Sequence, residues 1–211
     1  MDSTQMTGQD LRKVSGNKVN IRKMTVTAML SAIAFVLMFL DTAVPVMPSF
    51  IKLDLSELPA LMAAFALGPV WGVIVCFIKN ALHLLITQTG GIGELSNFIL
   101  GASFVIPAGY IYQRKKTKKH AILGAVVGAF VMAEISFPSN LYIVYPVYYN
   151  FMPKEVIIQA YQVLAPFANL DTIGKCLLMF NVPFTFVKGM LSAIITILIY
   201  KPLRPLLKGN N

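Results

Sequence analysis

Apolar residues in this chain gather in long runs that short polar segments separate. A helix needs about 20 apolar residues to cross a bilayer, and several of the runs approach that length. The predicted helices cover residues 24–40, 57–67, 70–87 and 95–112, a fifth stretch that begins near 121 and passes Pro138, and a last run from 181 to 199. None of them alternates polar and apolar residues as the strands of a membrane barrel do. The pattern therefore predicts an all-α integral membrane protein, a bundle of six transmembrane helices.

The second predicted helix is short, because Gly68-Pro69 follows residues 57–67. At about 1.5 Å per residue it covers only about half of the roughly 30 Å hydrocarbon core. We expect it to begin below the membrane surface or to continue in a bent form, with its charged start beside a recessed, wet cavity. A simpler role for Glu57 is helix capping, because Asp54 and Glu57 have the spacing of a capping box.

The two polar segments outside these runs differ in what they predict. Residues 1–20 have no periodic apolar face, so we expect a disordered tail there and a single six-helix membrane domain over residues 21–208. The segment 150–172 contains an amphipathic stretch from Pro153 to Leu164, which predicts a surface helix started by proline. A long ordered loop over a site often acts as a lid or gate.

The net charge of +9 is concentrated at three places along the chain. Five basic residues precede the first predicted helix, five lie within 114–119, and three lie after the last run. With six spans all three clusters fall on one side of the membrane, which the positive-inside rule makes the cytoplasmic side. We therefore expect a multi-pass protein of the plasma membrane with both termini in the cytoplasm, whose basic clusters meet anionic lipid and not nucleic acid.

Lys188 lies inside the last apolar run. A charge in the bilayer core costs roughly 2.5 to 3.5 kcal/mol on insertion scales, so such a lysine normally faces a cavity, a partner or a ligand. Asn181, Thr185 and Lys188 are spaced so that they share one face of a helix. That face predicts a polar binding surface. The alternative is that Lys188 only neutralises a carboxylate on a neighbouring helix or extends to the interface.

Lys79 is a second lysine in the middle of an apolar run. Glu134 lies about halfway through the fifth run, so we expect the two to form a structural pair within the membrane. His83, one turn after Lys79, is a lone histidine, which we interpret as a packed side chain.

Several kinds of chemistry find no support in the sequence. Cys76 and Cys176 have no CxxC neighbour or histidine cluster, so we expect neither a disulfide nor a metal site. The glycine-rich stretch 89–94 lacks the order of a phosphate-binding loop, so ATP hydrolysis would have to occur in partner chains. No nucleophile stands beside a base, and we expect no catalytic residues and no enzyme activity.

The first predicted helix carries small residues on one face. Ala28 and Ala32, with Ser31 beside them, form a small-xxx-small pattern that lets another helix approach closely. That other helix could belong to the same bundle or to another protein, and the pattern alone fits both.

Taken together, these features resemble the substrate-binding subunits (S components) of energy-coupling factor (ECF) vitamin transporters, most closely the riboflavin-specific ones. The resemblance extends over residues 24–207. It rests on the six helices and on the motifs Ala28-x-x-x-Ala32, 53–61, Lys79-Asn80, 140–148 and 181–189.

The resemblance implies a bacterial subunit that binds its vitamin from outside and works with a transmembrane coupling subunit and two ATP-binding cassette ATPases. It implies that Ala28 and Ala32 pack on the coupling subunit. Lys188, Asn140 and Glu57 resemble flavin contacts, while Thr185 stands where we expect asparagine in relatives. The candidate substrate-binding residues are Lys188, Asn140, Glu57, Thr185, Asn181, Asn97 and Phe50.

Three functions remain open at this point. A flavin needs apolar or aromatic walls with a few donors and acceptors, and the chain supplies both, so a high-affinity riboflavin-binding subunit with the flavin as transported ligand is the leading hypothesis. Flavin mononucleotide or another vitamin is the first alternative, because Lys188 and Lys52 could meet a phosphate. A membrane adaptor without transport activity is the second.

Overall fold

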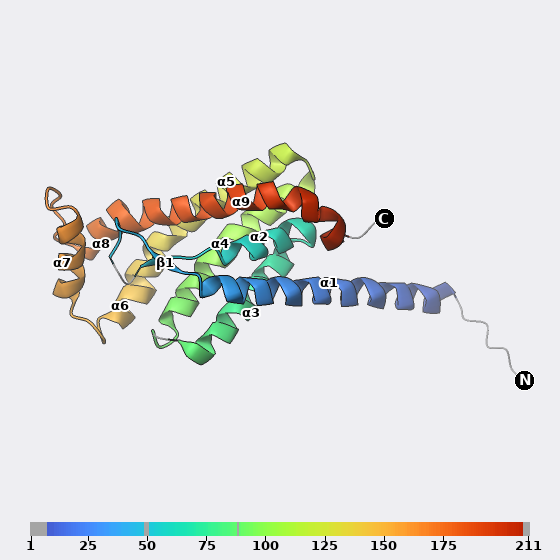
Figure 1. Ribbon diagram of the computed structural model, residues 1–211, viewed down its shortest axis with the longest axis horizontal. Coiled ribbons are helices and arrows are strands. Elements are labelled where there is room, and N and C mark those ends of the chain that lie inside the picture. The colour runs from blue at the N-terminus through green and yellow to red at the C-terminus, as the bar shows by residue number, and fades with distance from the viewer. Residues whose placement is uncertain (1–7, 49–50, 88, 209–211) are drawn as a thin grey trace, which may run out of the picture.

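The structure is a computed structural model that describes residues 8–48, 51–87 and 89–208. Its helices run mostly along one long axis, and helix α7 (Lys154–Leu164) lies across one end (Figure 1). We call this the α7 end. The start of α1 and the end of α9 lie toward the opposite end, as does the junction of α4 and α5 (Figure 1).

Most elements follow one another with short connections, and the first loop, residues 39–56, is longer. The helices are α1 (Gly8–Met38), α2 (Glu57–Ala66), α3 (Pro69–His83), α4 (Ile92–Arg114), α5 (Lys118–Ser139), α6 (Tyr145–Tyr148), α7, α8 (Ile173–Cys176) and α9 (Val182–Lys208). A 3-10 turn, η1 (Leu84–Ile86), follows α3, and two π-helical turns, η2 (Asn140–Val144) and η3 (Leu177–Asn181), precede α6 and α9. Two short antiparallel strands, β1 (Thr42–Ala43) and β2 (Lys52–Leu53), pair in the first loop.

The predicted membrane class is confirmed. Five stretches of the described chain are helical, long and apolar enough to cross a membrane, and the apolar helix α2 is shorter. The protein is thus an all-α membrane protein with five to six apolar helices. Helix α1 begins at Gly8, so helix occupies most of the segment 1–20 for which we expected no regular structure.

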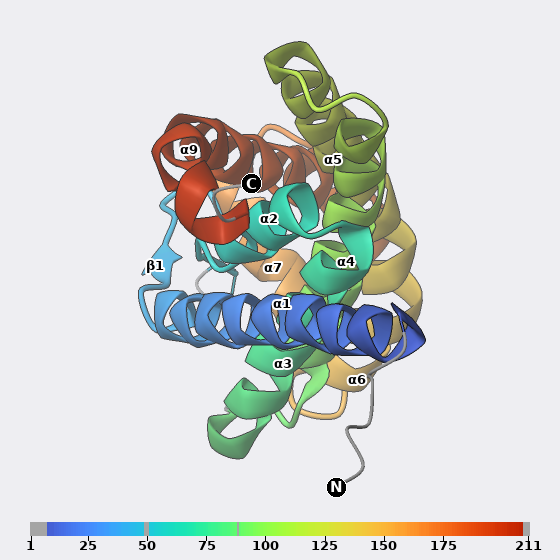
Figure 2. The same ribbon diagram turned by 90° about the vertical axis from the view of Figure 1, so that its right-hand side faces the viewer.

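Helix α2 lies within the bundle. It contacts α1, α3, α4 and α9, and Figure 2 shows it between α1 and α9. Nine of its ten residues are buried. The helix ends where predicted, before Gly68, whose φ of 117° is a conformation that L side chains rarely adopt. Because α2 starts inside the bundle, its first residue, Glu57, is buried as well.

Helix α5 approaches α4 on one side and α9 on another closely, through small residues. A Cβ atom on Gly128 of α5 would lie 2.5 Å from the carbonyl oxygen of Phe104, and one on Gly189 of α9 would lie 3.0 Å from Cβ of Ala129. Side chains at these positions would push the helices apart. Helix α5 is therefore packed closely against α4 and α9, which both contact α2.

Candidate functional site

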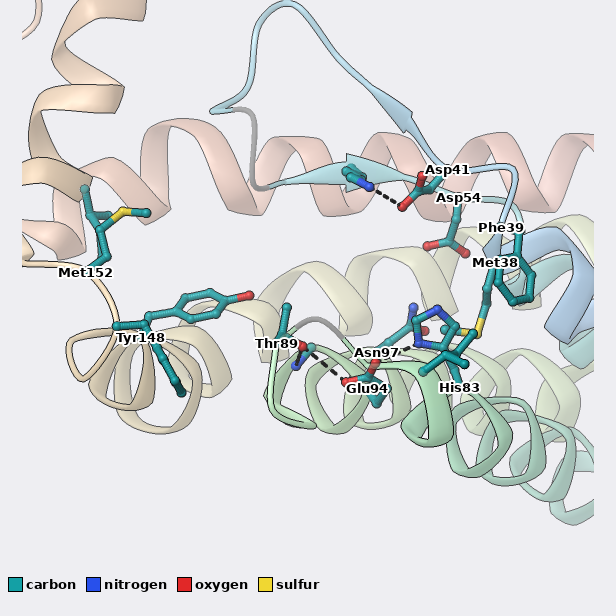
Figure 3. A pocket seen from close by; sticks show the side chains of 15 residues that line it. Met38, Phe39, Asp41, Asp54, His83, Thr89, Glu94, Asn97, Tyr148 and Met152 are labelled. Carbon is teal, nitrogen blue, oxygen red and sulfur yellow. Dashed lines mark hydrogen bonds and ion pairs between the residues drawn. The ribbon is translucent and has the colours of Figure 1, made fainter.

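The α7 end of the bundle contains a cavity of about 800 Å³. The end of α1, the first loop, α3, α4 and the segment from Tyr148 to Ile157 contribute its walls, and Figure 3 shows Tyr148 and Met152 on the opposite side from His83. The apolar and aromatic lining consists of Met38, Phe39, Ile86, Tyr148, Phe151, Met152 and Ile157. A cavity of this size and character suits a small organic ligand.

A smaller compartment of about 180 Å³ adjoins this cavity. Five residues line both spaces, namely Lys52, Asp54, Gly93, Asn97 and Tyr148. The smaller compartment brings together the candidate residues Glu57, Asn97, Asn140, Asn181, Thr185 and Lys188. Phe50, the remaining candidate, lies outside the described residues. The polar face predicted for the last helix therefore meets polar groups from α2, α4 and η2 in one place.

Two lysines and two carboxylates form a charge cluster of Asp54, Glu57, Lys79 and Lys188. The Lys188 Nζ atom lies 2.8 Å from Asp54 Oδ2 and 3.3 Å from Glu57 Oε1. Lys79 Nζ lies 3.4 Å from the same Glu57 oxygen and donates to Asn97 Oδ1 at 3.0 Å. The two positive and two negative charges attract one another, which offsets part of the desolvation cost of burying them.

Ser56 joins the two halves of the charge cluster. Its hydroxyl accepts a hydrogen bond from Lys79 and donates one to Asp54, and its backbone N–H donates to Asp54 Oδ1 at 2.9 Å. Ser56 precedes α2 but makes no side-chain capping bond. The carboxylate of Glu57 contacts the two lysines, so its role exceeds the helix capping that the sequence left open.

The pair expected between Lys79 and Glu134 is wrong. Glu134 is exposed on α5, and Lys79, which is fully buried, contacts Ser56, Glu57 and Asn97. The physical reason is the depth of α2. Helix α2 starts inside the bundle beside Lys79, so the carboxylate of Glu57 lies nearer to this lysine than the carboxylate of Glu134 does.

Asp54 belongs to the site although the sequence analysis assigned it only to helix capping. Burial alone would raise the pKa of its carboxyl, but the ammonium groups of Lys188 and Lys79 outweigh burial and hold that pKa below its usual range. Asp54 is therefore ionised at neutral pH and partners Lys188. One feature of the sequence pointed to this role of Asp54. It lies just before a helix that is too short to reach the membrane surface, so it is expected to be buried with the start of that helix.

Asn140 and Asn181 both lie in π-helical turns. Asn140 begins η2 and donates to the backbone carbonyl of Ser136 at 2.8 Å, whereas Asn181 ends η3 and accepts from the hydroxyl of Tyr161 at 2.7 Å. Such turns widen a helix locally and occur frequently at functional sites. Both asparagines are buried and line the smaller compartment.

A second polar network lines the larger cavity. His83 Nδ1 lies 2.7 Å from Glu94 Oε1, and the other oxygen of Glu94 accepts from Thr89 at 3.2 Å (Figure 3). That oxygen also accepts from Thr87 at 2.9 Å. The His83 ring also packs beside Phe39, with ring centroids 5.8 Å apart. The expectation of a merely packed histidine is therefore too simple, because His83 also partners a carboxylate in the cavity wall.

Helix α7 covers part of this end, as its amphipathic pattern predicted. Ile157 and Tyr161 form its buried face, and Ile157 lines the larger cavity. That α7 opens and closes as a lid stays a prediction.

Ala28 and Ala32 lie apart from both compartments. Both are exposed on α1, whereas Thr27, Ser31 and Ala34 of the same helix are buried. The small residues thus leave an open strip on the side of α1 that faces away from the bundle.

Comparison with known proteins identifies relatives of this chain. The family model for the ECF transporter substrate-specific component matches residues 22–200. The riboflavin transporter RibU of Staphylococcus aureus is 34% identical over 187 residues, which cover 89% of this chain and 93% of that protein. The riboflavin transporter FmnP of Bacillus subtilis is 28% identical over 190 residues, with 89% and 94% covered. A solved S component of a bacterial ECF transporter superimposes with a TM-score of 0.70 at 32% identity, covering 90% of this chain and 99% of that one.

Proposed function

This chain belongs to the substrate-specific (S) components of ECF transporters, and from this premise we propose that its substrate is riboflavin. As an S component it is a multi-pass membrane protein that binds a transported substrate and pairs with an energy-coupling module, and it is not an enzyme. Relatives named riboflavin transporters, which are about 30% identical to this chain, support a flavin as the substrate.

One observation carries the proposal. The smaller compartment gathers three asparagines, a threonine and two lysines beside two buried carboxylates, and it adjoins a larger cavity with apolar and aromatic walls. An isoalloxazine ring has one edge of carbonyl and imide groups that requires both donors and acceptors, and a flat remainder that requires apolar contact. We place the polar edge in the smaller compartment and the remainder of the flavin in the larger cavity.

Lys188 would contact the flavin as a donor that the charge cluster holds in place. Its ammonium group is bound by Asp54 and Glu57 and also lines the compartment. Preorganised donors cost little reorganisation on binding, which favours high affinity. Asn140, Asn181, Asn97 and Thr185 supply further polar contacts from other sides of the compartment.

The orientation in the membrane follows from the charges. We place six helices across the bilayer, counting α2, with the basic clusters and both termini in the cytoplasm. The α7 end then faces outside, so the flavin enters from there. We assign the coupling module one transmembrane subunit that packs on Ala28 and Ala32, and two ATP-binding cassette ATPases.

Flavin mononucleotide is a second candidate. Lys52 lines both compartments, with its side chain 48% exposed and paired to Asp41 at 2.9 Å. A phosphate at the end of the ribityl chain would find a partner in this lysine.

The test is direct. We expect the protein, purified in detergent, to carry a yellow ligand whose absorbance spectrum and mass identify riboflavin. After the ligand is removed, added protein should bind riboflavin and quench its fluorescence. An excess of biotin should not compete for the site. A parallel titration with flavin mononucleotide decides between the two flavins. A protein that binds neither flavin contradicts the proposal.

A further inference from the structure

Three side chains from separate elements meet behind the smaller compartment. Tyr161 of α7 and Tyr145 of α6 approach each other with hydroxyl oxygens 2.5 Å apart, and both reach Asn181 of η3. All three residues are buried. Tyr145 and Asn181 line the compartment, whereas Tyr161 lines neither compartment. Tyr161 thus contacts the binding site through its neighbours.

The donors and acceptors of these groups form a closed ring. Asn181 Oδ1 can only accept, so the Tyr161 hydroxyl donates its single hydrogen to it at 2.7 Å. Tyr145 must then donate to the oxygen of Tyr161. The oxygen of Tyr145 in turn accepts from Asn181 Nδ2 at 3.4 Å. Rotation of the Asn181 amide would break the hydrogen bonds of both its oxygen and its nitrogen, so the ring fixes the plane of that amide.

We propose that Tyr161 is a positioning residue for the flavin, which sets the orientation of the Asn181 amide toward the ligand. This inference rests on the proposed function. The ring uses one hydrogen of Asn181 Nδ2 and leaves the second for an acceptor in the compartment. A carbonyl oxygen at the polar edge of the isoalloxazine ring is an acceptor of the required kind.

The same bond links the covering helix to the site. Ile157, the other buried residue of α7, lines the larger cavity, so α7 contacts one compartment directly and the other through Tyr161 and Asn181. Movement of α7 away from the bundle would remove the bond that orients Asn181. Flavin release and undocking of α7 are therefore coupled through this hydroxyl.

The test removes the hydroxyl and keeps the ring. Tyr161→Phe retains the aromatic contact with Phe180, whose centroid lies 5.4 Å away, so the variant should fold. We expect its flavin affinity to fall about fivefold, the loss expected for one net hydrogen bond. Stopped-flow fluorescence should assign the loss to faster dissociation. The matched control is Tyr142→Phe on η2, an exposed tyrosine whose hydroxyl loss should leave affinity unchanged.

A double-mutant cycle separates positioning from packing. If Tyr161 acts through Asn181, Tyr161→Phe should cost no further affinity in an Asn181→Ala background, and Asn181→Ser serves as the background if the alanine variant binds too weakly to measure. Multiplicative losses would mean that Tyr161 only packs α7 on the bundle, and they overturn the inference, as does unchanged affinity of Tyr161→Phe. Failure of the wild-type protein to bind any flavin refutes the proposed function and this inference with it.

Discussion

The side chain of Lys188 connects the charge cluster with the proposed flavin site. Its ammonium group lies 2.8 Å from Asp54 and lines the smaller compartment. We expect Lys188→Ala to weaken flavin binding by more than about tenfold, which corresponds to about 1.4 kcal/mol. Fluorescence titration measures the effect. Lys175→Ala is the control, because its pair with Asp171 is exposed and should contribute little.

The loss of Lys188 also leaves a buried carboxylate without its partner, which can unfold the protein. Asp54→Asn in the same chain removes that charge, so the double variant should regain thermal stability without regaining flavin affinity. A stable double variant with the affinity of the wild type would show that Lys188 serves only the charge cluster.

The partner of Lys79 can be tested by the same logic. Removing one member of a buried ion pair typically costs about 3 to 5 kcal/mol, so Lys79→Met should strongly destabilise the protein. Adding Glu57→Gln should relieve part of this loss, whereas adding Glu134→Gln should not, because Glu134 is exposed on α5 while Lys79 and Glu57 are buried together. Thermal unfolding of the three variants decides. If Glu134→Gln, and not Glu57→Gln, restored stability to the Lys79→Met variant, Lys79 would pair with Glu134 as the sequence suggested.

Residue types could be predicted from the sequence better than residue partners. Asn181, Thr185 and Lys188 share a face because helical spacing is regular, and the structure places that face on the compartment. Asp54 and Tyr161 were missed, because each acts through a contact between elements that no local spacing reveals. Glu134 was chosen as a partner from its depth along a helix, although only the packing of α2 decides which carboxylate Lys79 meets.

The exposed strip on α1 leads to a prediction about how this helix packs against a partner. Replacing Ala28 and Ala32 with leucine should leave flavin binding intact, because both residues are exposed and lie outside the two compartments. The same change should prevent close helix approach by the coupling subunit, since packing is a main force that joins helices in lipid. Flavin titration beside a pull-down of the coupling subunit measures both. Lost flavin binding, or an intact complex, would show that this face is misassigned.

Contact between α4 and α5 depends on glycine. In Gly128→Ala the new Cβ would lie 2.5 Å from the Phe104 carbonyl oxygen, so the helices must separate. Overpacking of this kind costs about 1 to 3 kcal/mol, and we expect a clearly lower unfolding temperature. Gly174→Ala in α8 is the matched control, because nothing lies within 4 Å of the position that its Cβ would take, and it should be neutral or slightly stabilising. Equal stability of both variants would contradict the close approach.

The lengths of the apolar runs predicted the main helices of the fold better than they predicted its local irregularities. The all-α membrane class with five to six apolar helices, the short α2 and the surface helix α7 match the sequence pattern, because each depends on local hydrophobicity and on breakers such as Gly68-Pro69. The π-helical turns at Asn140 and Asn181 were not predicted. Pro138 and Pro183 lie within two residues of them and interrupt the backbone hydrogen bonds of the helix, but a proline alone does not determine that a π-turn forms.

The arrangement of the whole molecule predicts a direction of binding. The residues that line the two cavities lie toward the α7 end, while the start of α1, the end of α9 and the basic junction of α4 and α5 lie toward the other end (Figure 1). Since basic segments stay in the cytoplasm, right-side-out membrane vesicles should bind added flavin without ATP, and inside-out vesicles should not. A tag on the C-terminus reports the orientation of each preparation, because protease should remove it only from inside-out vesicles. Equal flavin binding by both kinds of vesicle, with the tag cut in only one, would mean that the site is accessible from the cytoplasm and that the proposed orientation of uptake is wrong.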